Sequence, residues 1–156
     1  MNGKHQGYTI LELLVVMAVL GILATAAMPL AELTARRAKE RELKQALWEI
    51  RHGIDAYKQA YDEGKIAKTA GASGYPPSLS LLVTGVADAT VPGRTIYLLR
   101  RIPRDPFALA AVPAEVSWGL RSYASPPDQP KPGIDVFDVY STSDAVGLNG
   151  LPYRQW

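Results

Sequence analysis

The chain has 156 residues, of which 47% are hydrophobic and 21% are charged, and its formal net charge is +2 at pH 7. This length suits one modest domain with one appendage, and so small a net charge does not by itself argue for nucleic-acid binding. The absence of cysteine excludes disulfides, thiolate metal sites and a cysteine nucleophile. The only two histidines, His5 and His52, leave little material for a Ser-His-Asp arrangement or a histidine-rich metal site.

An uncharged run lies close to the N-terminus. It extends from Leu13 to Leu30 without a charged side chain. As a helix, it is long enough to cross a bilayer core of about 30 Å. Glu12 comes directly before it. An ionised side chain at the centre of a membrane helix costs roughly 2.5–3.5 kcal/mol on insertion scales, so a carboxylate at such a place usually has a partner or a function.

Two ordinary interpretations of this run are open. A secretory signal peptide would use small residues such as Ala24 and Ala26 for cleavage, but the run is longer than the usual apolar core of a signal. A plain single-pass anchor explains the length and leaves Glu12 unexplained. The mass of the mature protein distinguishes these two interpretations from the one that follows.

The segment Gly7-Tyr8-Thr9-Ile10-Leu11-Glu12 resembles the leader junction of type IV pilins and of the pseudopilins of type II secretion systems. In that family a short basic leader ends in Gly, an aromatic residue follows, and a Glu occupies the fifth mature position. The resemblance implies cleavage between Gly7 and Tyr8, methylation of the Tyr8 amine, and pairing of Glu12 with the Tyr8 amine of a neighbouring subunit. Such a pair matches a buried charge and fixes the axial register. Pro29 adds to the resemblance, because pilin-like helices commonly carry a proline that kinks or locally melts the end of the apolar part.

The pattern after Pro29 predicts a continued helix. Apolar residues recur at steps of three and four and form one stripe, which we expect to pack in a core. Polar residues lie opposite the stripe. A helix from Thr9 to about Tyr61 would be roughly 80 Å long at 1.5 Å per residue, which makes sense if its first half is buried in a membrane or against sister helices. The stripe consists of Leu43, Leu47, Ile50, Ile54, Tyr57 and Tyr61, and the polar face of Arg41, Lys44, Gln45, Glu49, Arg51, Asp55 and Lys58.

The second half of the chain reads as loops with a few short elements. Residues 62–74 form a loop by composition, and a short helix is predicted near 77–84, with Gly85 at its end. Residues 95–102 are ambiguous between strand and extended loop. Strands are predicted at 116–124, with Val116, Trp118 and Leu120 on one face, and at 134–141, paired across a Pro-rich turn. The final loop, 142–156, carries Tyr153 and Trp156, which we expect to dock on the sheet or the helix.

This second half also resembles the pseudopilin group. The segment RRIPRDPF at 100–107 is similar to the Pro-x-Asp-Pro-aromatic segment of major pseudopilins. WGLRSY at 118–123 and DVFDVYSTSD at 135–144 are similar to the strand pair of that group, and GLNGLPYRQW at 147–156 is similar to the tail of one major-pseudopilin-like branch. The resemblance therefore spans nearly the whole chain.

One departure concerns calcium. Typical major pseudopilins bind calcium in the C-terminal loop through several acidic side chains, and calcium takes six to eight oxygens. After the second strand this chain offers Asp144 as the only carboxylate, with Ser141, Ser143 and Asn149 as neutral oxygens. A calcium site completed by backbone carbonyls is one interpretation. In the other, which the sequence favours, Asp144 caps a turn and the aromatic tail holds the loop down, so no cofactor is expected.

Catalysis and nucleic-acid binding have weaker support. The paired carboxylates, Asp135 with Asp138 and Asp62 with Glu63, have ordinary explanations as solvated charges, and the chain lacks a Gly-rich phosphate loop between a strand and a helix. We therefore expect that the protein is not an enzyme. A basic cluster directly after the apolar run fits a face beside lipid headgroups better than a DNA site; it consists of Arg36, Arg37, Lys39, Arg41 and Lys44.

Together these features predict an α+β, pilin-like chain. A long N-terminal α-helix, with a membrane-spanning first half, packs at its second half on a small antiparallel β-sheet. The predicted divisions are a cleaved leader at 1–7, a transmembrane or filament-core helix at 8–30, its amphipathic continuation at 31–61, and a periplasmic α+β region at 62–156.

The resemblance implies a structural subunit of a type II secretion pseudopilus that aids protein export across the outer membrane. Its partners would be further copies in a helical homopolymer, other pseudopilins, a prepilin peptidase, an inner-membrane platform protein and an assembly ATPase. The precursor would lie in a bacterial inner membrane with its N-terminus cytoplasmic and its C-terminal domain periplasmic. The alternatives are a subunit of a type IV pilus or DNA-uptake pilus, or a plain single-pass membrane-anchored periplasmic protein.

Overall fold

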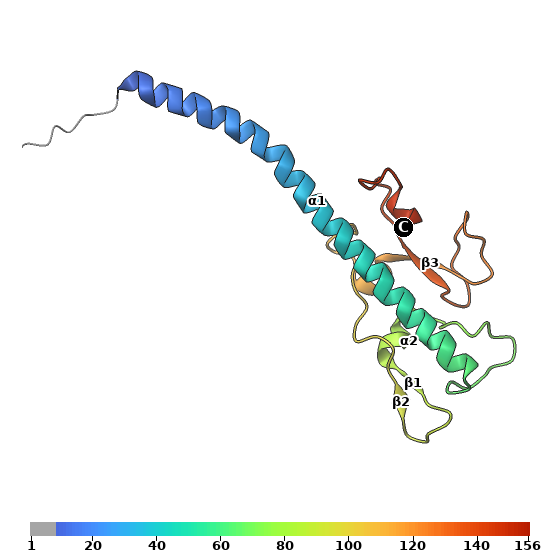
Figure 1. Ribbon diagram of the computed structural model, residues 1–156. Helices are drawn as coiled ribbons and strands as arrows, with labels where there is room; N and C mark the ends of the chain where they lie inside the picture. The colour runs from blue at the N-terminus through green and yellow to red at the C-terminus, as the bar shows by residue number, and fades with distance from the viewer. Residues whose placement is uncertain (1–8) are drawn as a thin grey trace, which may run out of the picture. The chain divides into compact units, whose positions relative to one another are not determined.

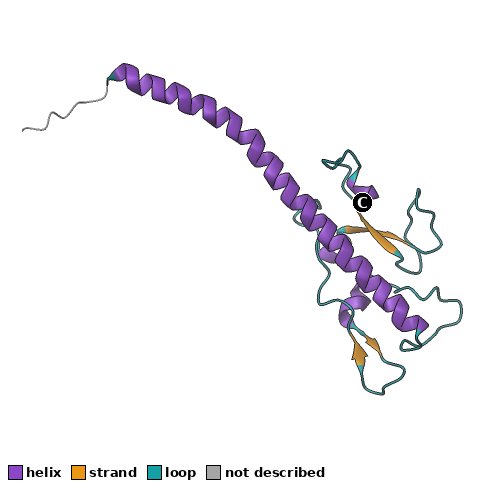
Figure 2. Ribbon diagram, viewed as in Figure 1, coloured by secondary structure: helices purple, strands orange, loops and turns teal. Residues whose placement is uncertain are grey.

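The computed structural model describes the backbone of residues 9–156 and all side chains in that range except those of residues 26–29. It divides into two units, of which the first ends at Ala38 and the second spans Lys39–Trp156. A long helix followed by small antiparallel sheets confirms the predicted α+β, pilin-like architecture (Figures 1 and 2). The elements in chain order are α1 (Ile10–Asp62), α2 (Leu79–Thr84), β1 (Val86–Ala87), β2 (Thr95–Ile96), the 3₁₀ turn η1 (Ala114–Val116), β3 (Trp118–Arg121), β4 (Asp138–Ser141) and the 3₁₀ turn η2 (Tyr153–Gln155).

The part of α1 that lies in the second unit carries the predicted apolar stripe. Leu43, Ile50 and Ile54 are fully buried, and Tyr57 is nearly so, whereas Tyr61 is only partly buried. Because α-helical residues three and four apart share one face, the stripe presents a continuous row of side chains to the rest of the unit. The core forms where this row meets Leu82, Leu99, Trp118, Val136, Val139 and Tyr153.

A short helix and a hairpin made of two two-residue strands follow the first loop. The predicted helix near 77–84 is confirmed as α2, and Gly85 ends it with a φ of 83° and an N–H bond to the carbonyl of Leu81 at 3.0 Å. A Cβ on Gly85 would lie 2.6 Å from Cγ2 of Thr95, so the position needs glycine for its space as well as its φ. In the ambiguous segment 95–102 only β2 is a strand, and it pairs with β1.

The predicted strand pair is confirmed, with shorter strands than expected. β3 and β4 are antiparallel, with Trp118 opposite Ser141 and Arg121 opposite Asp138. The prediction that Val116 lies on one face of a strand with Trp118 is wrong, because Val116 belongs to η1 and is 66% exposed, whereas Trp118 is buried. β3 begins only after η1, and β4 begins at Asp138 rather than at residue 134.

The middle of the strand pair depends on a close approach between Gly119 and Tyr140. These residues lie opposite each other in the register. A Cβ on Gly119 would lie 2.3 Å from the Tyr140 ring, so the absence of a side chain leaves the room that this ring occupies. The aromatic ring covers the sheet here in place of a second side chain.

Candidate functional site

The start of α1 is capped by Thr9. The Glu12 backbone N–H donates to Thr9 Oγ1 at 3.2 Å, and Glu12 itself lies in the first turn of the helix. A Thr followed three residues later by Glu is the capping-box pattern, and a carboxylate in the first turn also interacts favourably with the helix dipole. Glu12 therefore has a local role that the sequence analysis missed, although the spacing in Thr-Ile-Leu-Glu is visible in the sequence.

The apolar part of α1 is uncovered in the first unit. Every side chain from Ile10 to Thr25 is exposed; Leu11, for example, is 71% exposed and Ile22 is 70% exposed. The helix contains a stretch long and apolar enough to cross a membrane, and none of that stretch is buried. An exposed apolar surface of this size requires a lipid or protein surface to cover it, so this segment fits membrane anchoring.

The structure describes neither the predicted processing residues nor the side chain of Pro29. Gly7 and Tyr8 fall outside the described residues, so cleavage between them and methylation of Tyr8 stay predictions. The backbone of α1 is helical through position 29 without a break. The roles of Glu12 and Pro29 in assembly also stay predictions.

The basic cluster that follows the apolar run is solvent-exposed along α1. Lys44, a member of this cluster, contacts the Trp156 ring: its Nζ lies 4.7 Å from the ring centroid. Such a cation–π contact uses the lysine to hold the end of the chain. This placement matches a solvated face better than a groove shaped for nucleic acid.

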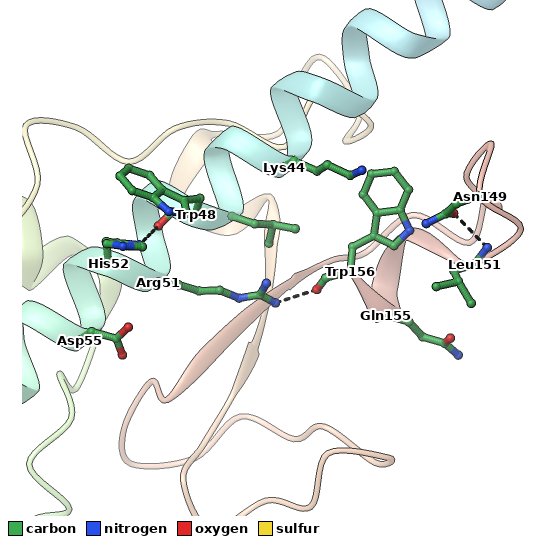
Figure 3. Close-up of a pocket in the computed structure, with 10 residues that line it drawn as sticks. Lys44, Trp48, Arg51, His52, Asp55, Asn149, Leu151, Gln155 and Trp156 are labelled. Atoms are coloured by element: carbon green, nitrogen blue, oxygen red, sulfur yellow. Dashed lines mark hydrogen bonds between the residues drawn. The ribbon is translucent and has the colours of Figure 1, made fainter.

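An open groove of about 570 Å³ runs beside α1 in the second unit (Figure 3). Its apolar surface includes Leu47, Leu151 and the rings of Trp48 and Trp156. Trp48 is 61% exposed and packs against His52, with ring centroids 3.9 Å apart. Nδ1 of His52 forms a hydrogen bond of 2.9 Å with the Trp48 carbonyl oxygen. This ring nitrogen is therefore not paired with the hydroxyl of a nucleophile. Among the residues that line the groove there is thus no nucleophile paired with a base.

The carboxylates that lie in pairs along the sequence, Asp135 with Asp138 and Asp62 with Glu63, make contacts that stabilise the fold. Asp138 bonds Nε of Arg51 at 2.8 Å and Nη2 of Arg121 at 3.2 Å. Asp62 pairs with Lys58 and Glu63 pairs with Lys65. These groups are therefore committed to local ion pairs.

Asp135 is a buried carboxylate held by neutral donors. It accepts hydrogen bonds from the Ser122 hydroxyl at 2.6 Å and from the Tyr123 backbone N–H at 2.9 Å. Burial raises the pKa of Asp135, but the hydrogen bonds to its charged form outweigh this effect and lower the pKa below its usual value. The group closes the Pro-rich turn between the two strands.

The side chains of the C-terminal loop do not form a carboxylate cluster for a calcium ion. Asp144 is exposed, and the neutral oxygens beside it are already engaged. The Ser141 hydroxyl donates to Asp105, Ser143 Oγ accepts the Ala145 N–H, and Asn149 Oδ1 accepts the Leu151 N–H. Within residues 9–156, no group of three or more His, Cys, Asp or Glu side chains could hold a metal ion.

Two side chains of α1 that hold the C-terminal loop were missed. Arg51, placed on the polar face by the pattern, is only half-exposed and reaches the backbone of both β4 and the C-terminal residue. Glu40 is 9% exposed and contacts the C-terminal loop. Glu40 lies three residues before Leu43, on the continuation of the apolar stripe, and a carboxylate at a core position was the signal that could have found it.

Comparison with known proteins gives one match. Residues 2–28 match the family model described as the prokaryotic N-terminal methylation motif. Neither the search of curated proteins nor the search of solved structures found a match. The matched residues include the junction at Gly7 and the start of the uncovered helix. The chain thus carries the N-terminal methylation motif of prepilin-like proteins, and this motif supports a pilin-like subunit of a pilus or pseudopilus.

Proposed function

We propose that this chain is a structural subunit of a type II secretion pseudopilus. One observation carries the proposal: the uncovered apolar part of α1 begins inside the matched methylation motif. An anchor that stays in lipid needs no processed end, whereas a subunit that leaves the bilayer needs both a trimmed end and a helix that packs on its copies. Head-to-tail contacts between identical subunits that do not close into a ring produce a helical filament.

Three steps follow from the proposal. The precursor lies in the inner membrane with its leader cytoplasmic and its second unit periplasmic. A prepilin peptidase cuts after Gly7, and the Tyr8 amine is methylated. The apolar helices then pack together outside the lipid, driven by an assembly ATPase and a membrane platform protein. The similarity of segments 100–107 and 118–123 to major pseudopilins supports the secretion role over the pilus role.

Processing is tested by the mass and N-terminal sequence of the mature chain. The full chain is expressed with a prepilin peptidase, and loss of residues 1–7 with one added methyl group is expected. Gly7→Leu should leave the precursor uncut in the membrane, while Gly3→Leu, a matched change inside the leader, should be processed. A mature chain that begins near residue 26 would instead identify a secretory signal peptide, and an intact Met1 would identify a plain anchor.

The secretion role is tested by deletion in the native host. Without the chain, folded export substrates should accumulate in the periplasm, and the full-length gene should restore their export. Normal export combined with loss of surface filaments or of DNA uptake would assign the chain to a pilus instead.

A further inference from the structure

The C-terminal loop, residues 142–156, is held to α1 by two charged side chains of that helix. We infer that Glu40 and Arg51 form a clamp that fixes this loop without a calcium ion, so that this chain folds independently of calcium. In a calcium loop, acidic side chains of the loop converge on a cation. Here the charges stand on the helix, and the loop supplies neutral donors and acceptors.

Glu40 is the anionic half of the clamp. Its Oε1 accepts the Leu148 backbone N–H at 2.7 Å and the Tyr153 hydroxyl at 2.9 Å. Both donors belong to the loop, and they lie 108 and 113 residues from Glu40 in the sequence. Glu40 is 9% exposed and Tyr153 is fully buried. Hydrogen bonds to a charged acceptor in such a place are stronger than neutral ones, so Glu40 ties two points of the loop to the helix.

Arg51 is the cationic half of the clamp. Its Nη2 donates to the Trp156 carbonyl at 2.7 Å and to the Val139 carbonyl at 3.1 Å, while Nε donates to Asp138 at 2.8 Å (the bond to Trp156 is drawn in Figure 3). One carboxylate and two backbone carbonyls thus converge on a fixed positive charge. These three oxygens are fewer than the six to eight that calcium takes, but the planar guanidinium matches them with directed N–H groups.

Aromatic packing completes the attachment between the two charged contacts. The Tyr153 ring stacks on Phe107 with centroids 4.1 Å apart and meets the Trp156 ring edge-on at 5.0 Å. Lys44 covers the Trp156 ring. The loop is therefore fixed at Leu148, Tyr153 and Trp156 by groups that this chain supplies itself, while Asp144 stays in solvent.

Calcium independence is tested by thermal unfolding of the full mature chain in detergent micelles, monitored by tryptophan fluorescence. The Tm should be equal, within about 1 °C, in 1 mM calcium chloride and in excess EDTA. A ligand that binds only the folded state raises the Tm. A rise of roughly 5 °C or more in calcium would overturn calcium independence.

The clamp itself is tested by hydrogen exchange of peptides from residues 142–156. Glu40→Ala and Arg51→Met should accelerate exchange in these peptides at least tenfold, and added calcium should not restore protection. Glu42→Ala and Arg41→Met, which change exposed residues of the same helix, are the matched controls and should leave the exchange unchanged.

A milder variant keeps the test decisive if Glu40→Ala does not fold. Tyr153→Phe removes only the hydroxyl that reaches Glu40, and it should accelerate exchange in the same peptides by a smaller factor. Glu40→Gln keeps an acceptor oxygen and should fall between Glu40→Ala and the wild type. Unchanged protection of residues 142–156 in Tyr153→Phe and Arg51→Met, or recovery of protection with calcium, would overturn the clamp.

Discussion

Asp105 and Ser141 are joined by a hydrogen bond of 2.6 Å that spans 36 residues of sequence. Both residues are fully buried. The second carboxylate oxygen of Asp105 accepts the Phe107 backbone N–H at 2.8 Å. The Asp of the Pro-x-Asp-Pro-aromatic segment is therefore a structural tie between the long loop before β3 and the end of β4.

Loss of this tie should destabilise the second unit. Asp105→Ala leaves the buried Ser141 hydroxyl and the part-buried Phe107 N–H without their acceptor, and each such group costs about 1–3 kcal/mol. We expect the free energy of unfolding to fall by about 2–4 kcal/mol in a urea titration of the full chain in micelles. Asp105→Asn keeps an acceptor for Phe107 and should lose about half as much. Equal stability of Asp105→Ala and the wild type would contradict the structural role.

A second prediction concerns the contact between Gly119 and Tyr140. Gly119→Ala places a methyl group where the Tyr140 ring lies, 2.3 Å from its nearest atoms, so the ring or the strand must move. Overpacking of this kind costs about 1–3 kcal/mol. Thermal unfolding should show a lower Tm for Gly119→Ala.

The matched control for this prediction is a double-mutant cycle. In a Tyr140→Ala background the ring is absent, so Gly119→Ala should have little effect on the Tm. An equal loss in both backgrounds would show that the cost comes from the strand backbone and not from the ring.

The sequence predicted those helices and strands that depend on a local pattern of residues. The apolar stripe of α1 repeats at helical spacing over five turns, and five of its six residues are buried. Gly85 marked the end of α2, and the alternation around Trp118 identified the first strand of the pair. β1 was missed and the segment that holds β2 stayed ambiguous, because two-residue strands are too short to show alternation.

The polar contacts of the candidate site could not be read from the sequence. Arg51 is separated from Val139 and Trp156 by 88 and 105 residues. Its position on the polar face of the helix is shared by exposed residues such as Lys44 and Asp55. Only the fold decides which charged residue on that face meets a backbone carbonyl. The prediction for Val116 was wrong for a local reason: Val116 belongs to a 3₁₀ turn and not to the strand whose alternation was predicted.

A third prediction concerns acid stability. The pKa of Asp135 is lowered in the folded chain, so its ionised form contributes stability that is complete above the unfolded value of about 3.9 and is lost as the pH falls through the lower, folded value. The wild type should therefore lose urea stability between roughly pH 5 and pH 2. Asp135→Asn should be less stable at pH 6 and should lose less over the acid range.

The control for this prediction is Asp128→Asn. Asp128 is exposed in the same Pro-rich turn, and its replacement should leave stability at pH 6 unchanged. A parallel pH dependence for Asp135→Asn and the wild type would show that other carboxylates cause the acid loss.

A fourth prediction separates the two roles of Glu12. Glu12→Gln keeps the capping-box spacing, because Gln also serves at that position, but it removes the charge. If Glu12 pairs with the amine of a neighbouring subunit, Glu12→Gln and Glu12→Ala should both impair filament assembly in pull-down of sheared or detergent-released filaments. Both variants should still be cut after Gly7. Normal assembly of Glu12→Gln beside defective Glu12→Ala would assign Glu12 to the helix cap alone.

The last prediction concerns the register that this pairing would impose. An amine at Tyr8 beside a neighbour's Glu12 offsets adjacent helices by four residues, about 6 Å at 1.5 Å per residue. The chain has no cysteine, so introduced thiols report contacts cleanly. Chains with Val16→Cys and chains with Leu20→Cys, expressed together, should form disulfide-linked dimers on mild oxidation. Val16→Cys with Leu23→Cys should form fewer, and Glu12→Gln in both chains should abolish the preference. Equal yields for the two offsets in the wild type would mean that Glu12 does not set the register.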